Sequence, residues 1–206
     1  MPNAERLKSR LSSEERQADI VQILLNLTAS NSPADITTMD IAKAIGLTQG
    51  AVFRHFPTKE AIWLSVLNWV QQNLLGKIDD AARSTPDPLK ALRAVFRAHV
   101  RFVAAYPGVP RIIFHELQKP GDSVCKQRVR MILQSHKKTA MDLLQAAKLQ
   151  GQVAADLRPE YASTLFLGAI QGLVLQSMAS GSTADPGKLS EGVLEVFLSG
   201  VESKQS

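Results

Sequence analysis

The chain has 206 residues, of which 45% are hydrophobic and 21% are charged. This composition is typical of a globular protein large enough to bury a core, and it argues against an intrinsically disordered chain. The single cysteine, Cys125, excludes an internal disulfide and fits a reducing cytoplasm. The first twenty residues are polar and charged, and apolar runs elsewhere are short. We therefore expect no signal peptide, no membrane-spanning segment and a cytoplasmic location.

The net charge of +5 is unevenly distributed along the chain. Residues 1–60 carry equal numbers of basic and acidic side chains, whereas residues 90–150 carry twelve basic and three acidic ones, net +9. A search for a basic patch would therefore select the middle of the chain. Arg93, Arg97 and Arg101 repeat every fourth residue, which favours a solvated helix face, with an anionic effector or an acidic partner as the alternatives. A DNA-binding prediction must therefore depend on sequence pattern.

Helical periodicity, interrupted by glycine, proline and polar clusters, predicts an all-α fold of about nine helices. Ser12 and Glu15 have capping-box spacing at the start of the first helix. The segment 84–88, Ser-Thr-Pro-Asp-Pro, is the clearest linker. The expected helices cover about residues 12–29, 38–45, 49–56, 58–82, 88–106, 110–118, 122–150, 159–180 and 186–201.

Two of these helices are short and are joined by a glycine-containing turn, which is the pattern of a helix-turn-helix. Thr37 or Thr38 is expected to cap the first of them, and Thr48 the second. Gly46 can adopt the positive φ that such a turn needs. The spacing therefore predicts a DNA reader between residues 37 and 60.

The second short helix is expected to have an apolar and a polar face. Val52 and Phe56 lie four residues apart and should pack inward. The residues then expected to point outward, with Phe53 at the edge, are Gln49, Gly50, Ala51, Arg54 and His55. Glutamine can hydrogen-bond adenine, arginine can hydrogen-bond guanine, and an alanine methyl can touch thymine. The residues expected to reach phosphates are Thr37, Thr38, Thr48, His55 and Lys59.

This stretch resembles the TetR family of bacterial transcriptional regulators. The resemblance is carried by residues 36–60, ITTMDIAKAIGLTQGAVFRHFPTKE, and extends at motif level over about residues 12–65. It implies that Thr38, Phe53, His55 and Lys59 contact phosphates and that Gln49, Gly50, Ala51 and Arg54 face bases. The family often has tyrosine at position 53, whose hydroxyl binds phosphate. Phe53 lacks that hydroxyl, which leaves packing as its role.

A reader of this size contacts few bases, so we expect the protein to act as a homodimer on a near-palindromic operator. The favoured interpretation is a ligand-responsive repressor with a DNA-binding domain over residues 1–57, a connecting helix over 58–83 and a regulatory and dimerisation domain over 84–206. An activator without a small-molecule effector is one alternative. An all-α interaction module or enzyme that does not bind DNA is another.

Metal-ligand spacing, a phosphate-binding glycine loop and a nucleophile elbow are not recognisable, so we expect no enzyme activity, cofactor or metal.

The resemblance implies that the last two helices meet their symmetry mates in a four-helix bundle. The alternative is that the helix over 159–180 forms the core of the monomer. The candidate interface residues are Leu165, Phe166, Ala169, Ile170, Gly172, Leu173, Val193, Val196, Phe197 and Gly200.

The resemblance also implies a small-molecule pocket in the regulatory half, whose occupation separates the two readers. The candidate lining residues are Phe96, His99, Val100, Phe102, Val103, Ile113, His115, Glu116 and Phe166. The aromatic residues among them could equally be ordinary core.

Cys125 lies next to Lys126 and near Arg128, which could lower its pKa and make it an oxidant sensor, with an inert surface thiol as the alternative.

Overall fold

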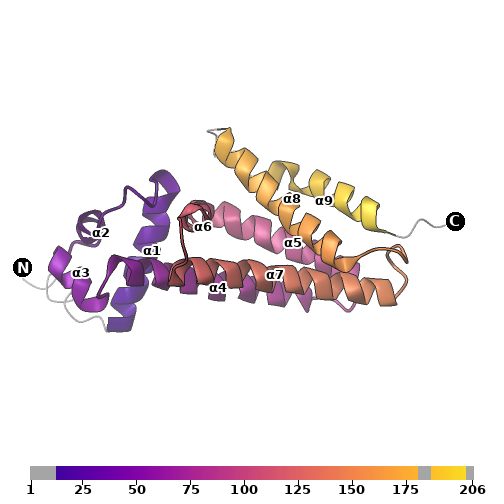
Figure 1. The fold of residues 1–206 in the computed structure, drawn as a ribbon, viewed down its shortest axis with the longest axis horizontal. Helices are drawn as coiled ribbons and strands as arrows, with labels where there is room; N and C mark the ends of the chain where they lie inside the picture. The colour runs from indigo at the N-terminus through magenta and orange to yellow at the C-terminus, as the bar shows by residue number, and fades with distance from the viewer. Residues whose placement is uncertain (1–12, 181–186, 203–206) are drawn as a thin grey trace, which may run out of the picture. The chain divides into compact units, whose positions relative to one another are not determined.

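The structure is a computed structural model that describes residues 13–180 and 187–202. Nine α-helices lie within these residues, in the order shown in Figure 1. They are α1 (Ser13–Ser30), α2 (Thr38–Ile45), α3 (Gln49–His55), α4 (Lys59–Ala82), α5 (Pro88–Ala105), α6 (Gly108–Gln118), α7 (Val124–Leu149), α8 (Pro159–Ala179) and α9 (Gly187–Val201). The all-α prediction is confirmed, and each expected helix has a counterpart. The capping box expected at Ser12 lies outside the described residues.

The helices group into two compact units. The first unit contains the described residues of 1–69 and 106–128, and the second contains those of 70–105 and 129–206. α6 joins the first unit because it packs on α1. Each of these units is built from two separate stretches of the chain. The predicted domains, with boundaries at residues 57 and 84, are instead continuous in sequence. That functional division stays a prediction.

The first unit has an apolar core to which each of its helices contributes. α1, α2 and α3 contact one another, and α6 covers α1. Burial of aliphatic side chains of this kind contributes about 1.5–3 kcal/mol per residue, so a few shared residues can hold short helices in place. The most deeply buried of these side chains include Ile20, Leu24, Ile41, Val52, Ile62, Val66 and Ile112.

α6 approaches α1 closely at Gly108. A Cβ atom at this position would overlap Oγ1 of Thr28 and lie 2.7 Å from the carbonyl oxygen of Leu25. Thr28 is fully buried, and its hydroxyl donates to the carbonyl oxygen of Leu24 at 2.8 Å. Since one of the two neighbours is backbone, the contact cannot relax by a rotamer change alone. The absence of a side chain at position 108 is therefore what allows the two helices to pack.

In the second unit, three aromatic rings join α5, α8 and α9. The centroids of Phe96 and Phe166 are 5.5 Å apart and those of Phe166 and Phe197 are 5.4 Å apart, both in edge-to-face geometry. Such pairs add about 0.5–1.5 kcal/mol beyond the area they bury. Phe166 is fully buried between the other two rings, so the core of this unit is centred on α8.

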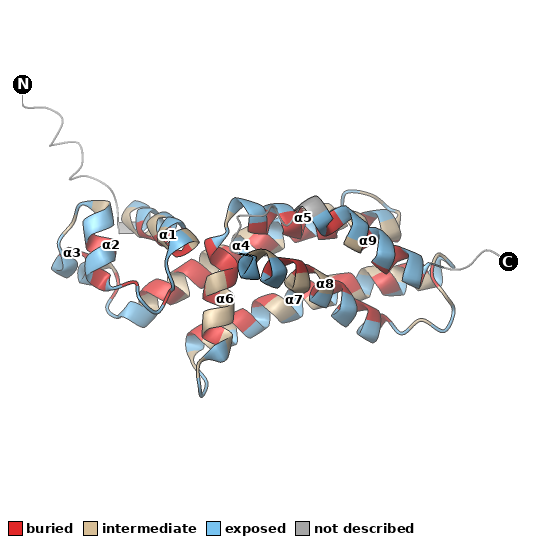
Figure 2. Ribbon diagram, turned by 90° about the horizontal axis from the view of Figure 1, so that it is seen from above, coloured by how far each residue is buried: buried red, intermediate tan, exposed pale blue. Residues whose placement is uncertain are grey.

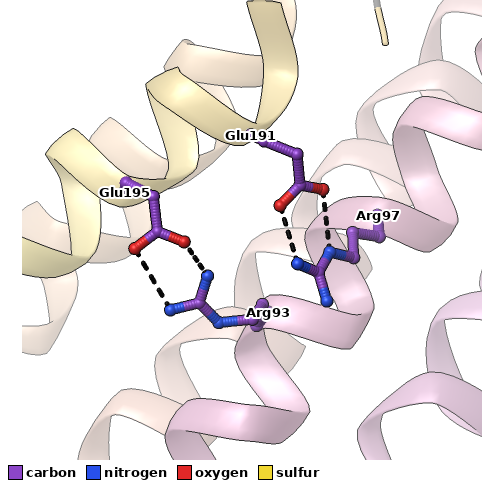
Figure 3. A network of polar contacts seen from close by, with 4 residues as sticks. All are labelled: Arg93, Arg97, Glu191 and Glu195. Atoms are coloured by element: carbon purple, nitrogen blue, oxygen red, sulfur yellow. Dashed lines mark hydrogen bonds and ion pairs between the residues drawn. The ribbon is translucent and has the colours of Figure 1, made fainter.

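Two arginine–glutamate pairs join α5 to α9, as Figure 3 shows. Arg97 donates to both carboxylate oxygens of Glu191, at 2.8 and 2.7 Å, and Arg93 pairs with Glu195. The hydrogen bond from Arg97 lowers the pKa of Glu191. Exposed pairs of this kind contribute little to stability, because solvent screens them. Part of the positive charge of residues 90–150 is therefore engaged in packing within the chain.

α8 is apolar enough to be mistaken for a membrane span. Among the described residues it is the one helix long and apolar enough to cross a membrane by length and composition, with a mean hydropathy of 1.3 over its most apolar window. The expectation that no segment reaches this criterion therefore does not hold for α8. Core helices of globular proteins meet the same criterion, and α8 packs against both α5 and α9.

We predict that Gly108→Ala lowers the free energy of unfolding by about 1–3 kcal/mol, because the added methyl forces α6 away from α1. Urea unfolding monitored by circular dichroism measures the change. Gly76→Ala is the matched control, since Gly76 is exposed on α4 and a Cβ there would have no atom within 4 Å, so alanine should add up to about 1 kcal/mol. Equal stability of the two variants would contradict the close approach at Gly108.

Candidate nucleic-acid interface

The start of α2 is fixed by a capping box. Thr37 Oγ1 accepts a hydrogen bond from the backbone N–H of Asp40 at 3.1 Å, and the Asp40 carboxylate accepts one from the N–H of Thr37 at 2.8 Å. Hydrogen bonds from Thr37 lower the pKa of Asp40. Of the two threonines left open by the sequence, Thr37 is thus the cap. The capping role of Asp40 was not predicted from the sequence, although the Thr-x-x-Asp spacing is that of a capping box.

The turn between α2 and α3 uses a left-handed glycine. Gly46 has φ +68°, and the N–H of Leu47 donates to the carbonyl oxygen of Ala42 at 2.9 Å. Thr48 then caps α3, its Oγ1 accepting from the N–H of Ala51 at 3.2 Å. The positive φ expected at Gly46 and the cap expected at Thr48 are both confirmed. These contacts set the direction in which α3 leaves the turn.

One face of α3 is buried and the other is exposed, as the pale blue of its outer side in Figure 2 indicates. Val52 and Phe56 are buried as predicted. Ala51 is also buried, with 8% of its surface exposed, so its expected outward orientation is wrong. Position 51 lies about 100° from position 52 on the helix and falls within the same inward arc. The residues that do form the exposed outer face of α3 are Gln49, Gly50, Phe53 and Arg54.

Two side chains of this region bind each other across the motif. Gln49 Nε2 donates to Thr38 Oγ1 at 2.5 Å, and Thr38 is buried with 8% of its surface exposed. The Thr38 hydroxyl only accepts in this contact and keeps its own O–H for a phosphate, and Gln49 keeps its amide oxygen and a second N–H for a base. At the other end of α3, Gln17 Nε2 donates to the carbonyl oxygen of half-buried His55 at 3.1 Å. No local pattern singles out Gln17, because its partner lies 38 residues away.

Exposed cations surround this motif. Arg54 is exposed near the end of α3, and Lys59 is exposed at the first residue of α4, where Thr58 Oγ1 caps the helix by accepting from the N–H of Ala61 at 3.0 Å. Lys43 and Lys59 both act electrostatically on the carboxylate of Asp40. Helix N-termini combined with lysine side chains favour phosphate binding. Lys43 was not predicted as a contact, although its place in the last turn of α2 is visible in the sequence.

Comparison with known proteins identifies this arrangement. Residues 25–66 match the family model described as bacterial regulatory proteins, tetR family. The chain is 30% identical to the nucleoid occlusion factor SlmA of Glaesserella parasuis over 149 residues, which cover 71% of this chain and 74% of that protein. The chain belongs to the TetR family. It is a DNA-binding transcriptional regulator, as the helix-turn-helix pattern predicted.

A more distant relative and two solved structures are also similar over most of the chain. SlmA of Vibrio cholerae is 24% identical over 159 residues, covering 76% of this chain and 81% of that protein. The regulator FadR of Bacillus subtilis, solved with stearoyl-CoA, superposes with a TM-score of 0.78 at 20% identity and covers 90% of this chain and 99% of that one. The ketosteroid regulator KstR2 of Mycobacterium tuberculosis gives a TM-score of 0.75 at 19% identity, covering 92% and 96%.

The residues expected to line a TetR-type pocket fall into both units. Six are buried in the second unit, namely Phe96, His99, Val100, Phe102, Val103 and Phe166. The other three, Ile113, His115 and Glu116, belong to α6 in the first unit. Among the described residues, no group of three or more His, Cys, Asp or Glu side chains is arranged to hold a metal ion.

The candidate interface residues also divide by exposure. Leu165, Val196 and Gly200 are exposed, and Ala169, Gly172 and Val193 are half-buried. The remaining four, which the structure places in the core of the second unit, are Phe166, Ile170, Leu173 and Phe197. Apolar character alone does not distinguish a helix face that packs within the chain from one that faces a partner.

Cys125 is neither an activated nor a surface thiol. It is buried, and its Sγ lies 3.7 Å from the carbonyl oxygen of Glu60. Burial, with the nearby Glu116 and Glu60, raises the pKa of the thiol to about 11. The basic neighbours in sequence, Lys126 and Arg128, do not lower it. The oxidant-sensor alternative is therefore not supported, since a thiol with a raised pKa is a weak nucleophile.

A histidine pair lies in the core of the second unit. Nδ1 of His99 is 3.1 Å from Nδ1 of His136, and the ring centroids are 4.6 Å apart. Burial lowers the pKa of His99 well below its ordinary range, helped by the proximity of His136. Burial also lowers the pKa of His136 to about 4. Both rings are therefore neutral at pH 7, and one of them donates the shared hydrogen bond.

This pair predicts a loss of stability in mild acid. The unfolded chain takes up protons near pH 6.5, whereas folded His136 stays neutral until about pH 4, so the free energy of unfolding falls as pH drops through this window. We expect a decrease of about 2 kcal/mol between pH 7.5 and pH 5 from His136 alone. Urea titrations at the two pH values measure this decrease in the free energy of unfolding. The decrease should be smaller in the His136→Leu variant, which lacks the titrating imidazole. An unfolding free energy that is unchanged between pH 7.5 and pH 5 would exclude the buried neutral pair.

Proposed function

We propose that the protein is a dimeric, ligand-responsive repressor that reads a near-palindromic operator with α3. The observation that carries this proposal is the exposed outer face of α3, where Gln49, Gly50 and Arg54 are polar or small. A Cβ at Gly50 would have no atom of the described residues within 4 Å, so packing against those residues does not require glycine there. A missing side chain does, however, let backbone approach a DNA groove closely.

The proposed contacts sort into two kinds. Arg54 and Gln49 would read base edges in the major groove, where arginine pairs with guanine and glutamine with adenine. Thr48, His55 and the ammonium of Lys59 would bind phosphates and fix the register of α3, and Thr37 would join them after its hydroxyl releases the Asp40 carboxylate, to which it donates at 2.6 Å. Thr38 would join them through its own O–H, since it only accepts from Gln49. Ala51 is omitted, because its burial leaves little surface for a thymine contact. Phe53, which is 40% exposed, would pack against the sugar backbone.

The proposed dimer is formed by the apolar stripes that α8 and α9 leave exposed. On α8, Tyr161, Leu165 and Leu175 are 63%, 62% and 49% exposed. Leu165 lies about one turn and Leu175 about four turns beyond Tyr161, so the three side chains share a face. On α9, Leu189 and Val196 are 63% and 74% exposed and lie about two turns apart. Since α8 and α9 contact each other, the stripes can form one continuous surface. Large exposed apolar surfaces of this kind mark interfaces, and a second copy would place two α3 helices about 34–36 Å apart.

The proposed effector is a small molecule held in the second unit, and the protein is proposed to act in the cytoplasm without catalytic activity. The regulator FadR of Bacillus subtilis was solved with stearoyl-CoA, which supports an effector of this general kind without identifying it. The buried His99 and His136 would offer the polar contacts in an otherwise aromatic core. Arg93 and Arg97 are paired with glutamates of α9, so they are not the expected anchors of an anionic effector.

We predict that Arg54→Ala and Lys59→Ala weaken DNA binding in different ways. Loss of Arg54 should cost about 1–3 kcal/mol on the operator and relax its sequence preference, because a base contact is removed. Loss of Lys59 should weaken binding to all sequences and reduce the slope of log K against log salt by about one. Fluorescence anisotropy with duplexes from the neighbouring promoter, at several salt concentrations, measures both.

Arg83→Ala serves as the charge control, since Arg83 is exposed at the end of α4 and is paired with Asp80. Its affinity and salt slope should match those of the unmodified protein. Equal losses in all three variants would mean that net charge, rather than the α3 face, governs DNA binding.

We predict that Leu165→Glu or Val196→Glu converts the dimer to a monomer, because a carboxylate would be buried in the proposed interface without a partner. Sedimentation velocity measures the mass. Leu149→Glu is the matched control: Leu149 is 81% exposed at the end of α7, and the variant should remain dimeric. A dimer that survives both α8 and α9 substitutions would place the interface elsewhere.

A second candidate function is supported by one observation. The relatives at 30% and 24% identity are nucleoid occlusion factors, and they cover most of this chain. DNA binding by the same α3 face would then serve chromosome organisation rather than a promoter. Mapping bound sites across the chromosome separates the two: a repressor occupies few sites next to the genes it controls, whereas an occlusion factor occupies many dispersed sites and changes the expression of few genes when deleted.

A further inference from the structure

The first unit contains a cavity of about 390 Å³ that lies outside the α3 face. Its walls come from the loop between α1 and α2, the start of α4, the end of α6 and the start of α7. The volume falls within the range of small-molecule sites in proteins. The second-unit cluster around His99 contributes nothing to it, so it is a separate site from the proposed effector pocket.

Glu116 gives this cavity a specific chemistry. The residue lines the cavity and is 1% exposed. Its Oε1 is paired with the ammonium of Lys119, but its Oε2 is buried and has no hydrogen-bond partner within the described part of the chain. A buried carboxylate oxygen without a hydrogen-bond donor is costly, because the water it has lost is not replaced by another partner. A ligand that brings N–H donors to Oε2 would remove that cost.

The other walls favour a flat, donor-bearing molecule. Trp63 lines the cavity with an otherwise buried indole, which can stack on an aromatic ring or a planar cation. Burial lowers the pKa of His115 and raises that of the Cys125 thiol to about 11, so both are uncharged at pH 7. The two lysines and two glutamates of the lining balance in charge. The unpartnered oxygen Oε2 of Glu116 therefore determines which ligand the cavity prefers, namely one that carries N–H donors.

We propose that this cavity binds a small aromatic molecule carrying an amidinium or a protonated amine, with its N–H donors on Glu116 Oε2 and its ring against Trp63. The site lies in the same unit as the helix-turn-helix and includes Lys59, one of the proposed phosphate contacts. The proposal does not rest on DNA binding, and it is tested in the absence of DNA.

The test is a titration of the full-length, ¹⁵N-labelled protein with benzamidine, benzamide and benzoate, which share size and ring but carry positive, zero and negative charge. The indole N–H signal of Trp63 reports binding, and that of Trp69 is the internal reference. We expect benzamidine to bind with a Kd of about 1 mM or tighter, benzamide at least about tenfold more weakly, and benzoate to leave the Trp63 signal unchanged.

Glu116→Gln removes the charge at nearly constant volume and should weaken benzamidine binding at least about tenfold. Glu14→Gln, an exposed carboxylate on α1, is the matched control and should bind normally. If Glu116→Gln unfolds, Ala34→Phe narrows the cavity from the exposed loop without touching Glu116 and should abolish the Trp63 response. Similar affinity for all three molecules, no response to benzamidine at several millimolar, or unchanged binding in the Glu116 or Ala34 variant would overturn the proposal.

Discussion

A helix of seven residues has too few internal hydrogen bonds to be stable in water, and α3 therefore depends on what holds its two ends and one face. The left-handed turn at Gly46 and the cap at Thr48 fix its start. Burial of Val52 and Phe56 fixes one side, and Gln17 binds the carbonyl oxygen of His55 at its end. The proposed DNA contacts depend on this constraint, because the same interactions that stabilise α3 determine which of its residues remain exposed.

The distribution of charge follows from this arrangement. Residues 1–60 have no net charge, yet Lys59 lies at the N-terminus of α4, where backbone N–H groups and the Thr58 cap also favour phosphate, and Arg54 is exposed near the end of α3. In the basic middle of the chain, Arg93 and Arg97 are held by glutamates of α9. Local placement of a few charges therefore outweighs bulk charge as an indicator of the DNA-binding face.

The features that could be predicted from the sequence are those set by local chemistry. Prolines, glycines and capping threonines mark helix ends, and Gly46 identifies the turn because few other residues tolerate its φ. The features that could not be predicted are non-local or depend on fine register. Ala51 falls within the buried arc of α3, and Gln17 meets a partner in another helix. Glu116 lines a cavity whose walls come from four separate segments of the chain. Whether Phe166 faces its own core or a second copy depends on packing, which apolarity alone does not reveal.

DNA binding through α3 is tested most directly by an amide chemical-shift map of the full-length protein titrated with a duplex from the adjacent promoter. We predict the largest shifts at Gln49, Gly50 and Arg54, with smaller ones at the helix ends near Thr37 and Lys59, and little change in α5 and α7. Shifts confined to the basic helices α5 and α7, with α3 unperturbed, would contradict binding through α3.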